Sequence, residues 1–259
     1  MAEEKRQFPT EVVNLPSKGK LYPKDSPLAG GTIELKYMTA KEEDILTSRN
    51  LIQKGVVLDR LLESVIVDEK VSLSDLLLGD KNAIMIATRI LGYGKDYTVQ
   101  LTDPSTGDKQ EETFDLTSIN DKEMDWDLFK SGKNEFEFDL PSSKVKLMFR
   151  LLSHKEEKEI DDELKAYKKF SKQSGITSEI TTRLKKAIVS VNGDTSQKRV
   201  HEFVDNELLS RDSLAFREYL IKITPDVDMS FTFTSDTTGE DTTMDIPLDV
   251  EFFWPAGRR

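Results

Sequence analysis

The same order of local signals occurs twice in this chain of 259 residues, and that repetition constrains the fold more than any other feature. In the first half, a strand-like segment at residues 32–38 precedes a capping box, in which Thr39 and Glu42 bond backbone N–H groups at a helix start. Two apolar stripes with helical spacing follow. They consist of Leu58, Leu61, Leu62, Val65 and Ile66, and of Ala83, Ile86, Ala87, Ile90 and Leu91. Residues 97–116 then alternate as two strands around a turn at 103–107, which predicts a β-hairpin.

The second half repeats these signals. Leu147, Phe149 and Leu151 alternate as in a strand, and Ser153 with Glu156 forms another capping box. Two further helical stripes are predicted, from Leu184, Ala187, Ile188 and Val191 and from Phe216, Tyr219, Leu220 and Ile223. A turn at residues 234–239 matches the first hairpin turn. We therefore predict an α+β fold, a tandem duplication of a strand–helices–β-hairpin unit whose halves are related by a pseudo-two-fold.

The predicted boundaries lie where the periodic patterns are interrupted. Proline and glycine mark an extended strap before the first unit, and a polar, acidic stretch separates the two units. The predicted segments are the N-terminal strap 1–31, the first repeat 32–116, the linker 117–133, the second repeat 134–252 and the C-terminal tail 253–259.

Charge and composition exclude several classes of function. The net charge of −11 disfavours nonspecific attraction to nucleic acid or to an anionic membrane surface. Absence of cysteine excludes disulfides, thiolate nucleophiles and sulfur-ligated metals. No apolar stretch resembles a secretory signal or approaches the ~20 residues that span a bilayer, so we expect a cytosolic protein without a membrane partner. A basic stretch at residues 165–186 is interpreted as a solvated helix face.

No catalytic pattern is recognisable in the sequence. His154 lies in the second capping box, and His201-Glu202 lacks the second histidine of a zinc-protease motif. Gly92 and Gly94 follow a predicted helix, whereas a phosphate-binding loop precedes one. We therefore predict a protein that is not an enzyme and uses no cofactor and no small-molecule substrate. An enzyme whose acid–base carboxylates converge only in the fold is the alternative.

The two hairpin turns have the outline of zinc knuckles that lack thiols. The positions of the metal ligands would be Asp103, Thr106, Ser235 and Thr238. Hydroxyl groups are poor zinc ligands, so these residues would not hold zinc as thiolates do. Ordinary hairpin turns and a degenerate metal site are the two interpretations, and neither predicts bound metal.

Aromatic side chains gather at the end of the chain. They either cover the chain's own hairpin sheet or anchor a partner, since Trp and Phe are suited to interface hot spots. The predicted partner-binding residues, taken from the strap and from this end, are Leu15, Pro16, Tyr22, Pro23, Phe252, Phe253 and Trp254.

Four segments together resemble the T4-like bacteriophage baseplate protein family. They read LPSKG with YP at residues 15–23, YMTAKEEDIL at 37–46, LLLGDKNA at 76–83 and FFWP at 252–255. The resemblance covers nearly the whole chain and implies a tailed-phage protein at the hub of a contractile-tail baseplate. It also implies Cys-x-x-Cys at the two hairpin turns of relatives, where this sequence has no cysteine.

The predicted function is therefore that of a structural or assembly protein that binds other phage tail and baseplate proteins. Its predicted location is the host cytoplasm during assembly, or the tail baseplate of the virion. The alternative is a nucleic-acid-binding module descended from a zinc-ribbon-like protein, which would use the basic stretch at residues 165–186.

Overall fold

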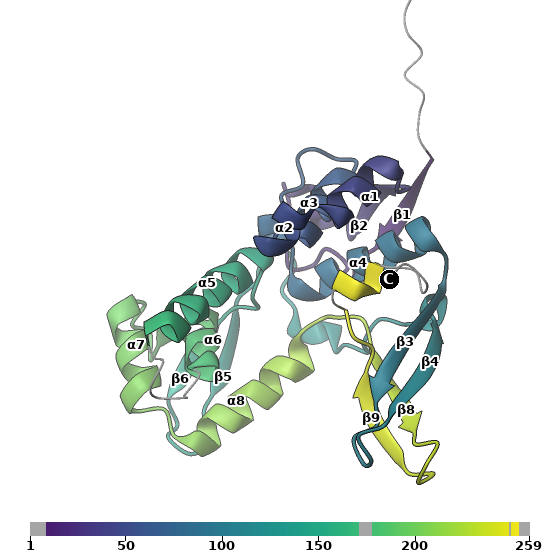
Figure 1. Ribbon diagram of the computed structural model, residues 1–259. Coiled ribbons are helices and arrows are strands. Elements are labelled where there is room, and N and C mark those ends of the chain that lie inside the picture. The colour runs from purple at the N-terminus through teal and green to yellow at the C-terminus, as the bar shows by residue number, and fades with distance from the viewer. Residues whose placement is uncertain (1–8, 171–177, 249, 254–259) are drawn as a thin grey trace, which may run out of the picture.

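The computed structural model describes residues 9–170, 178–248 and 250–253, which form a mixed α+β fold in three groups (Figure 1). The N-terminal body contains β1 (Thr10–Asn14), β2 (Thr32–Lys36), α1 (Ala40–Thr47), α2 (Arg49–Gln53), α3 (Val57–Val65) and α4 (Leu78–Tyr93). The C-terminal body contains β5 (Phe136–Asp139), β6 (Lys146–Phe149), α5 (His154–Phe170), α6 (Glu179–Ala187), β7 (Ile188–Val191), α7 (Gln197–Asn206) and α8 (Ser210–Ile223). The hairpin pair contains β3 (Asp96–Thr102), β4 (Lys109–Asp115), β8 (Ser230–Thr234) and β9 (Asp241–Asp245).

Each body is built on a small antiparallel sheet. In the N-terminal body β1 pairs with β2, and Ile66, directly after α3, bridges Leu35 of β2. In the C-terminal body the strand order is β5-β6-β7. The sequence pattern did not predict β1, which lies inside the predicted strap and ties the strap to the first body by strand pairing.

The predicted capping box at Thr39 forms, and at Ser153 the bond from the backbone N–H to the carboxylate of Glu156 forms. The Thr39 backbone N–H donates to the Glu42 carboxylate at 2.8 Å, and the Ser153 backbone N–H donates to Glu156 at 2.9 Å. The carboxylate of Glu42 is fully buried and also accepts from the Ser64 hydroxyl at 2.6 Å and from the Lys36 ammonium at 3.0 Å. Glu42 therefore joins α1 to both β2 and α3.

One predicted helical stripe is wrong in its second half. Helix α6 ends at Ala187, and Ile188 to Val191 form strand β7 beside β6. Isoleucine and valine at 188, 189 and 191 favour a strand because branching at Cβ suits the pleated, buried surface of a sheet. The helical spacing is thus shared by the end of one element and the start of the next.

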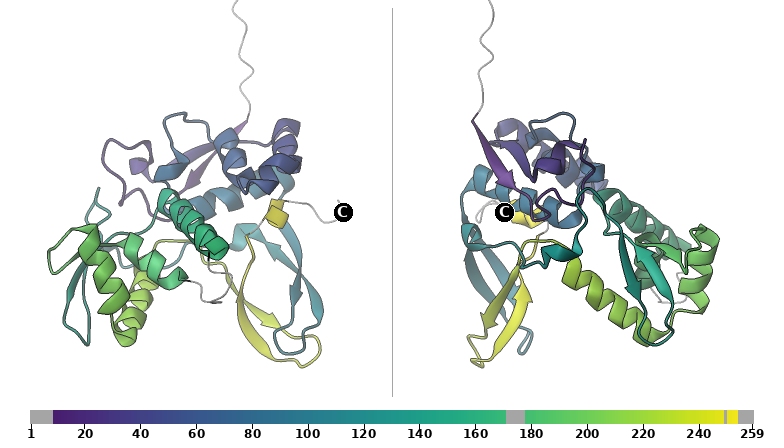
Figure 2. Two further views of the ribbon diagram at one scale, coloured as in Figure 1. Left: turned by 60° about the vertical axis from the view of Figure 1, so that its left-hand side comes forward. Right: turned by 180° about the vertical axis from the view of Figure 1, so that it is seen from behind.

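Both predicted hairpins are confirmed, and they lie side by side although they come from opposite halves of the chain (Figures 1 and 2). The rings of Phe114 and Phe231 meet edge to face with centroids 4.6 Å apart. The Gln110 side chain donates to the Thr234 carbonyl at 3.0 Å and accepts from the Asp236 N–H at 2.9 Å. Because an isolated hairpin is marginally stable, each hairpin supports the other.

Replacing Glu42 with glutamine should lower the free energy of unfolding by about 2 kcal/mol, because a neutral amide cannot accept all the bonds that converge on this buried carboxylate. Although burial acts to raise the pKa of Glu42, hydrogen bonds from Ser64 and Thr39 lower it from 4.5 to about 2. The carboxylate therefore stabilises the fold above pH 4.5, and this contribution is lost as the pH falls towards 2.

Urea unfolding of the wild type, Glu42→Gln and the exposed control Asp44→Asn at several pH values measures this effect. The difference in the free energy of unfolding between wild type and Glu42→Gln should become smaller as the pH falls. Asp44→Asn should unfold with the same free energy as the wild type. A gap that is constant with pH would contradict the assignment.

Candidate functional site

The first turn of α4 lies where the N-terminal body meets the C-terminal body. A Cβ atom at Gly79 would lie 2.0 Å from the Pro225 carbonyl oxygen, so only glycine permits this approach of α4 to the end of α8. The Asn82 amide donates to the Asp226 carboxylate at 3.0 Å, and the backbone N–H of His154 donates to the Leu76 carbonyl at 2.8 Å. Residues on either side of the α4 start therefore bind the start of α5 and the segment that follows α8.

The strap is attached to this same turn through a buried carboxylate. Asp80, fully buried, accepts from the Ser17 backbone N–H at 2.9 Å and from the Ser17 hydroxyl at 2.7 Å. The Tyr22 hydroxyl donates to Asp80 at 2.5 Å and accepts from the Leu77 N–H at 3.0 Å. Burial raises the pKa of Asp80, and it also raises the pKa of Tyr22, next to that carboxylate. We call Ser17, Tyr22 and Asp80 the first clamp.

A second clamp of the same kind lies in the C-terminal body. Asp212, in the first turn of α8, is fully buried and accepts from the backbone N–H groups of Ser142 at 2.7 Å and Ser143 at 2.9 Å. Both clamps bind a Leu-Pro-Ser segment, residues 15–17 in the first and 140–142 in the second. The sequence carries this repeat, but residues 15–17 lie in the predicted strap, outside the two predicted repeats, so the prediction does not include it.

A charged network joins the two bodies beside the first clamp. Asp59 of α3 accepts from His154 Nε2 at 3.0 Å, and the ammonium groups of Lys81 and Lys158 lie 3.4 and 3.6 Å from its carboxylate. Lys81 Nζ also lies 3.1 Å from His154 Nδ1, so Lys81 donates to an imidazole that in turn donates to Asp59. Asp59, His154 and Lys158 line a cavity of about 220 Å³, and Glu63 also lines it.

The arrangement favours an ion-paired joint. Burial acts to raise the pKa of Asp59, but the His154 hydrogen bond and the nearby lysines lower it to about 2. A general base needs a pKa closer to neutrality. The sequence did not reveal this group, because Asp59, Lys81 and His154 belong to segments that are distant in the chain.

The structure brings two of the four knuckle positions together. Asp103 and Ser235 are both buried, and the Ser235 hydroxyl donates to the Asp103 carboxylate. Asp103 also accepts from the Ser105 N–H at 2.8 Å, and Ser235 Oγ accepts from the Thr238 N–H at 3.0 Å. Hydrogen bonds from Ser105 and Ser235 lower the pKa of Asp103. A serine–carboxylate bond thus joins the two turns.

The other two knuckle positions serve their own turns. Thr106 Oγ1 accepts from the Asp108 N–H at 3.2 Å, and Thr238 Oγ1 accepts from the Glu240 N–H at 3.3 Å. Within the ranges that the structure describes, no three His, Asp or Glu side chains are arranged to hold a metal ion.

Most of the predicted partner-binding residues are covered by the chain itself. Leu15, Pro16, Tyr22, Phe252 and Phe253 are buried. The predicted anchors also include Pro23, which is exposed, and Trp254, which lies outside the described residues. Contact of the buried residues with a partner stays a prediction, and it would require these segments to leave their present positions.

The C-terminal segment is held by α4. Phe252 meets Tyr97 edge to face with centroids 4.8 Å apart, and Arg89 Nε donates to the Phe252 carbonyl at 2.9 Å. Phe252 therefore packs on the chain's own β3 and is bonded to α4, as the first of the two interpretations expects, while Trp254 lies outside the described residues.

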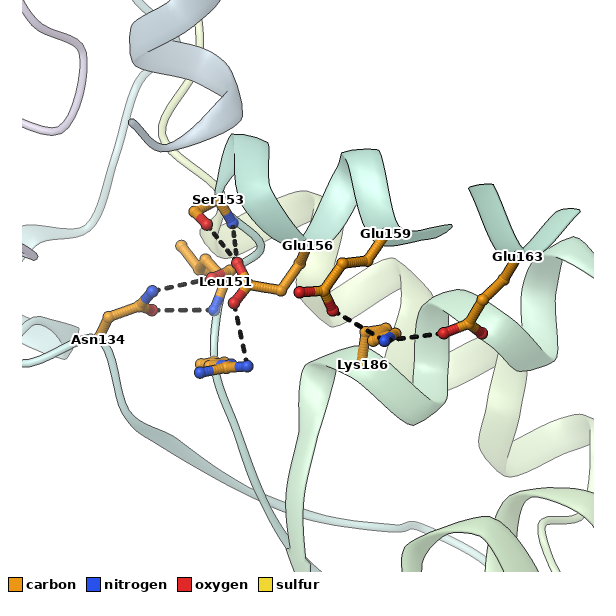
Figure 3. Close-up of polar contacts among 8 residues, drawn as sticks. Asn134, Leu151, Ser153, Glu156, Glu159, Glu163 and Lys186 are labelled. Carbon is orange, nitrogen blue, oxygen red and sulfur yellow. Dashed lines mark hydrogen bonds and ion pairs between the residues drawn. The ribbon is translucent and has the colours of Figure 1, made fainter. Parts of the chain in front are cut away.

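Within the basic stretch, the cationic side chains of α6 are paired with carboxylates, whereas Lys172 lies outside the described residues. Arg183 binds Glu157 with a bond of 2.7 Å, and Lys186 lies 2.9 Å from both Glu159 and Glu163, as Figure 3 shows for Lys186. Lys185 lies 2.6 Å from Asp205. These pairs join α6 to α5 and α7, and they reduce the positive charge that a nucleic acid would meet. None of the helices in the described ranges is both long and apolar enough to cross a membrane.

A family model described as T4 bacteriophage base plate protein matches residues 8–254 of this chain. No curated protein sequence and no solved structure matches it.

The two clamps should respond oppositely to acid. Asp80→Ala and Asp212→Ala should each lower the free energy of unfolding by about 2 kcal/mol at pH 7, because each leaves buried donors without an acceptor. The pKa of Asp212 is lowered, since the Ser142 and Ser143 bonds outweigh the burial that acts to raise it, so its contribution is lost as the pH falls. The raised pKa of Asp80 means that the wild type gains stability over Asp80→Ala as the pH falls.

Denaturant unfolding between pH 7 and pH 3, with the exposed Asp25→Ala as control, tests this pair. As the pH falls, the difference in the free energy of unfolding between wild type and variant should become smaller for Asp212→Ala and larger for Asp80→Ala. Equal trends for the two variants would contradict the assignment.

Asp103→Ala should loosen the tips of both hairpins. It removes the acceptor of the Ser235 hydroxyl and of the Ser105 N–H, so amide hydrogen exchange should accelerate about tenfold at both turns. The control Asp108→Ala changes a neighbouring exposed carboxylate and should affect the first turn alone. Unchanged exchange at residues 235–239 in Asp103→Ala would show that the turns are independent.

Proposed function

The chain belongs to the T4 bacteriophage base plate protein family, and we propose that it acts without catalysis, by protein–protein binding, at the hub region of a contractile-tail baseplate. The observation that carries this proposal is the extent of the match, residues 8–254, which takes in both bodies and the hairpin pair. A phage baseplate structural protein is what the family supports. The hub position and the mode of binding are the proposal.

The geometry supports a structural role. The bond from Asn82 to Asp226, the Asp59 network and the hairpin pair each join segments from the two halves of the chain, so the halves are connected at three places. Each connection buries polar groups whose hydrogen bonds are formed within the chain, and such networks favour a single arrangement of the parts. A rigid body suits a component that must hold its neighbours at fixed positions.

The proposed partners are other phage tail and baseplate proteins. Five of the seven predicted anchors are buried, namely Leu15, Pro16, Tyr22, Phe252 and Phe253, so contact is proposed only through the exposed Pro23 and through Trp254. The larger part of the docking surface must then lie elsewhere on the two bodies.

We also propose that the two bodies arose by internal duplication. Each has a strand, a Leu-Pro-Ser segment, a second strand, a capping box, helices and a strand or bridge that returns to the second strand. Each then has a long helix with a buried aspartate in its first turn that binds the Leu-Pro-Ser segment, and each ends in a hairpin. Superposition of residues 10–115 on 136–245 tests the proposal, because unrelated halves would not bring Asp80 onto Asp212.

Removal of the gene from a phage that carries it should abolish complete baseplates while leaving heads intact. Mass spectrometry of purified virions and of baseplate intermediates should find the protein in the intermediates, and its presence in virions would identify a permanent subunit. Normal baseplates in the deletion strain, with no trace of the protein in any baseplate fraction, would refute the proposed function.

A further inference from the structure

A groove lies between α6 and α8. It encloses about 470 Å³ and ends at the start of α4. Its apolar lining comes chiefly from Leu152, Ile180, Leu184, Leu220 and Ile221. Ile180 and Ile221, one from each helix, are 47% and 67% exposed, so large aliphatic side chains stand in solvent on both sides of the groove. Such exposed apolar surface is typical of an interaction site.

The polar groups around the groove are mostly cationic, in a chain of net charge −11. They are Lys122, Arg150, Arg183 and Arg217, against the carboxylates of Glu179 and Asp226. A positive rim on an otherwise acidic protein marks a local preference for negative charge.

Arg217 differs from the other three cations. Arg150 pairs with Glu156, Arg183 with Glu157, and Lys122 donates to the Ile221 carbonyl. The Nε atom of Arg217 is buried, and no acceptor in the described part of the chain bonds it. A buried N–H group without a partner is costly, and an acceptor supplied from outside would remove that cost.

We propose that this groove is the docking site for an acidic amphipathic segment of a neighbouring baseplate protein, which inserts aliphatic side chains between Ile180 and Ile221 and places a carboxylate on Arg217. The proposal rests on the proposed function, because it takes the neighbour to be a baseplate protein. The apolar floor requires aliphatic side chains, and the cationic rim with its free donor requires a carboxylate.

Other occupants fit the groove less well. A nucleic acid would leave the apolar floor of the groove uncovered. A second copy of this chain would bring another −11 charge and long-range repulsion.

Two synthetic 14-residue helical peptides with the same leucine face provide the probes, one with glutamate and the other with lysine at the polar positions. They are titrated into the full-length protein carrying labelled Ile, Leu and Val methyl groups. The glutamate peptide should shift the methyl signals of Ile180, Leu184, Leu220 and Ile221 and should bind about tenfold tighter than the lysine peptide. Equal binding of the two peptides, or shifts confined to another surface, would overturn the proposal.

Matched variants identify the groups responsible. Arg217→Gln should weaken binding of the glutamate peptide about fivefold and leave binding of the lysine peptide unchanged. The control Arg211→Gln replaces an exposed arginine of the same helix and should change the binding of neither peptide. Ile221→Glu should abolish binding of the glutamate peptide. Identical behaviour of the two arginine variants would remove the carboxylate contact from the proposal, and concentration-dependent shifts at these methyls without peptide would identify a second copy as the occupant.

Complementation of the phage deletion separates this inference from the proposed function. Ile221→Glu should accumulate as folded protein but fail to join baseplate intermediates. If Ile221→Glu is incorporated into baseplate intermediates as well as the wild type is, the proposed docking site in the groove is wrong, while the proposed function stands. Absence of the wild-type protein from every baseplate fraction would instead refute the proposed function.

Discussion

The contact on which the rest of the structure depends is the close approach of the first turn of α4 to the end of α8, which Gly79 permits. From this turn, Asp80 holds the strap, Lys81 reaches the network on Asp59 and His154, and Asn82 holds Asp226. Three consecutive side chains thus bind three different parts of the molecule. The relative position of the two bodies follows from this single turn of helix.

The local elements of this fold could be predicted to a large extent, because their signals are local. A capping box, a helical stripe and a Gly-containing turn each span only a few residues. The structure has the hairpins, and the bonds to Glu42 and Glu156 at the helix starts, at the positions that these signals predict. The prediction failed where one spacing fits two elements, since Ile188 and Val191 are buried in strand β7 and their separation of three residues also fits a helical stripe. The family resemblance added the baseplate assignment, which the match over residues 8–254 confirms.

The junction could not be predicted, because its residues meet only after folding. Asp59, Lys81 and His154 carry no shared motif, and the groove is formed by side chains from α6 and α8 that have no common pattern in the sequence. The residues chosen as partner anchors illustrate the opposite difficulty. Phe252 and Tyr22 have the chemistry of interface anchors, but the same chemistry suits a core, and sequence does not distinguish the two.

The hairpin pair also bears on how the chain is synthesised. The hydrogen bond that links the hairpins connects Asp103 to Ser235, which are 132 positions apart in the sequence. The ring contact between Phe114 and Phe231 also joins residues that are far apart in the sequence. During translation, β3 and β4 must leave the ribosome long before their partner hairpin exists, with an aromatic surface still open. The first hairpin can reach its final state only after residues 230–245 have emerged, so a product truncated before them would expose the aromatic surface at Phe114 that Phe231 covers in the folded chain.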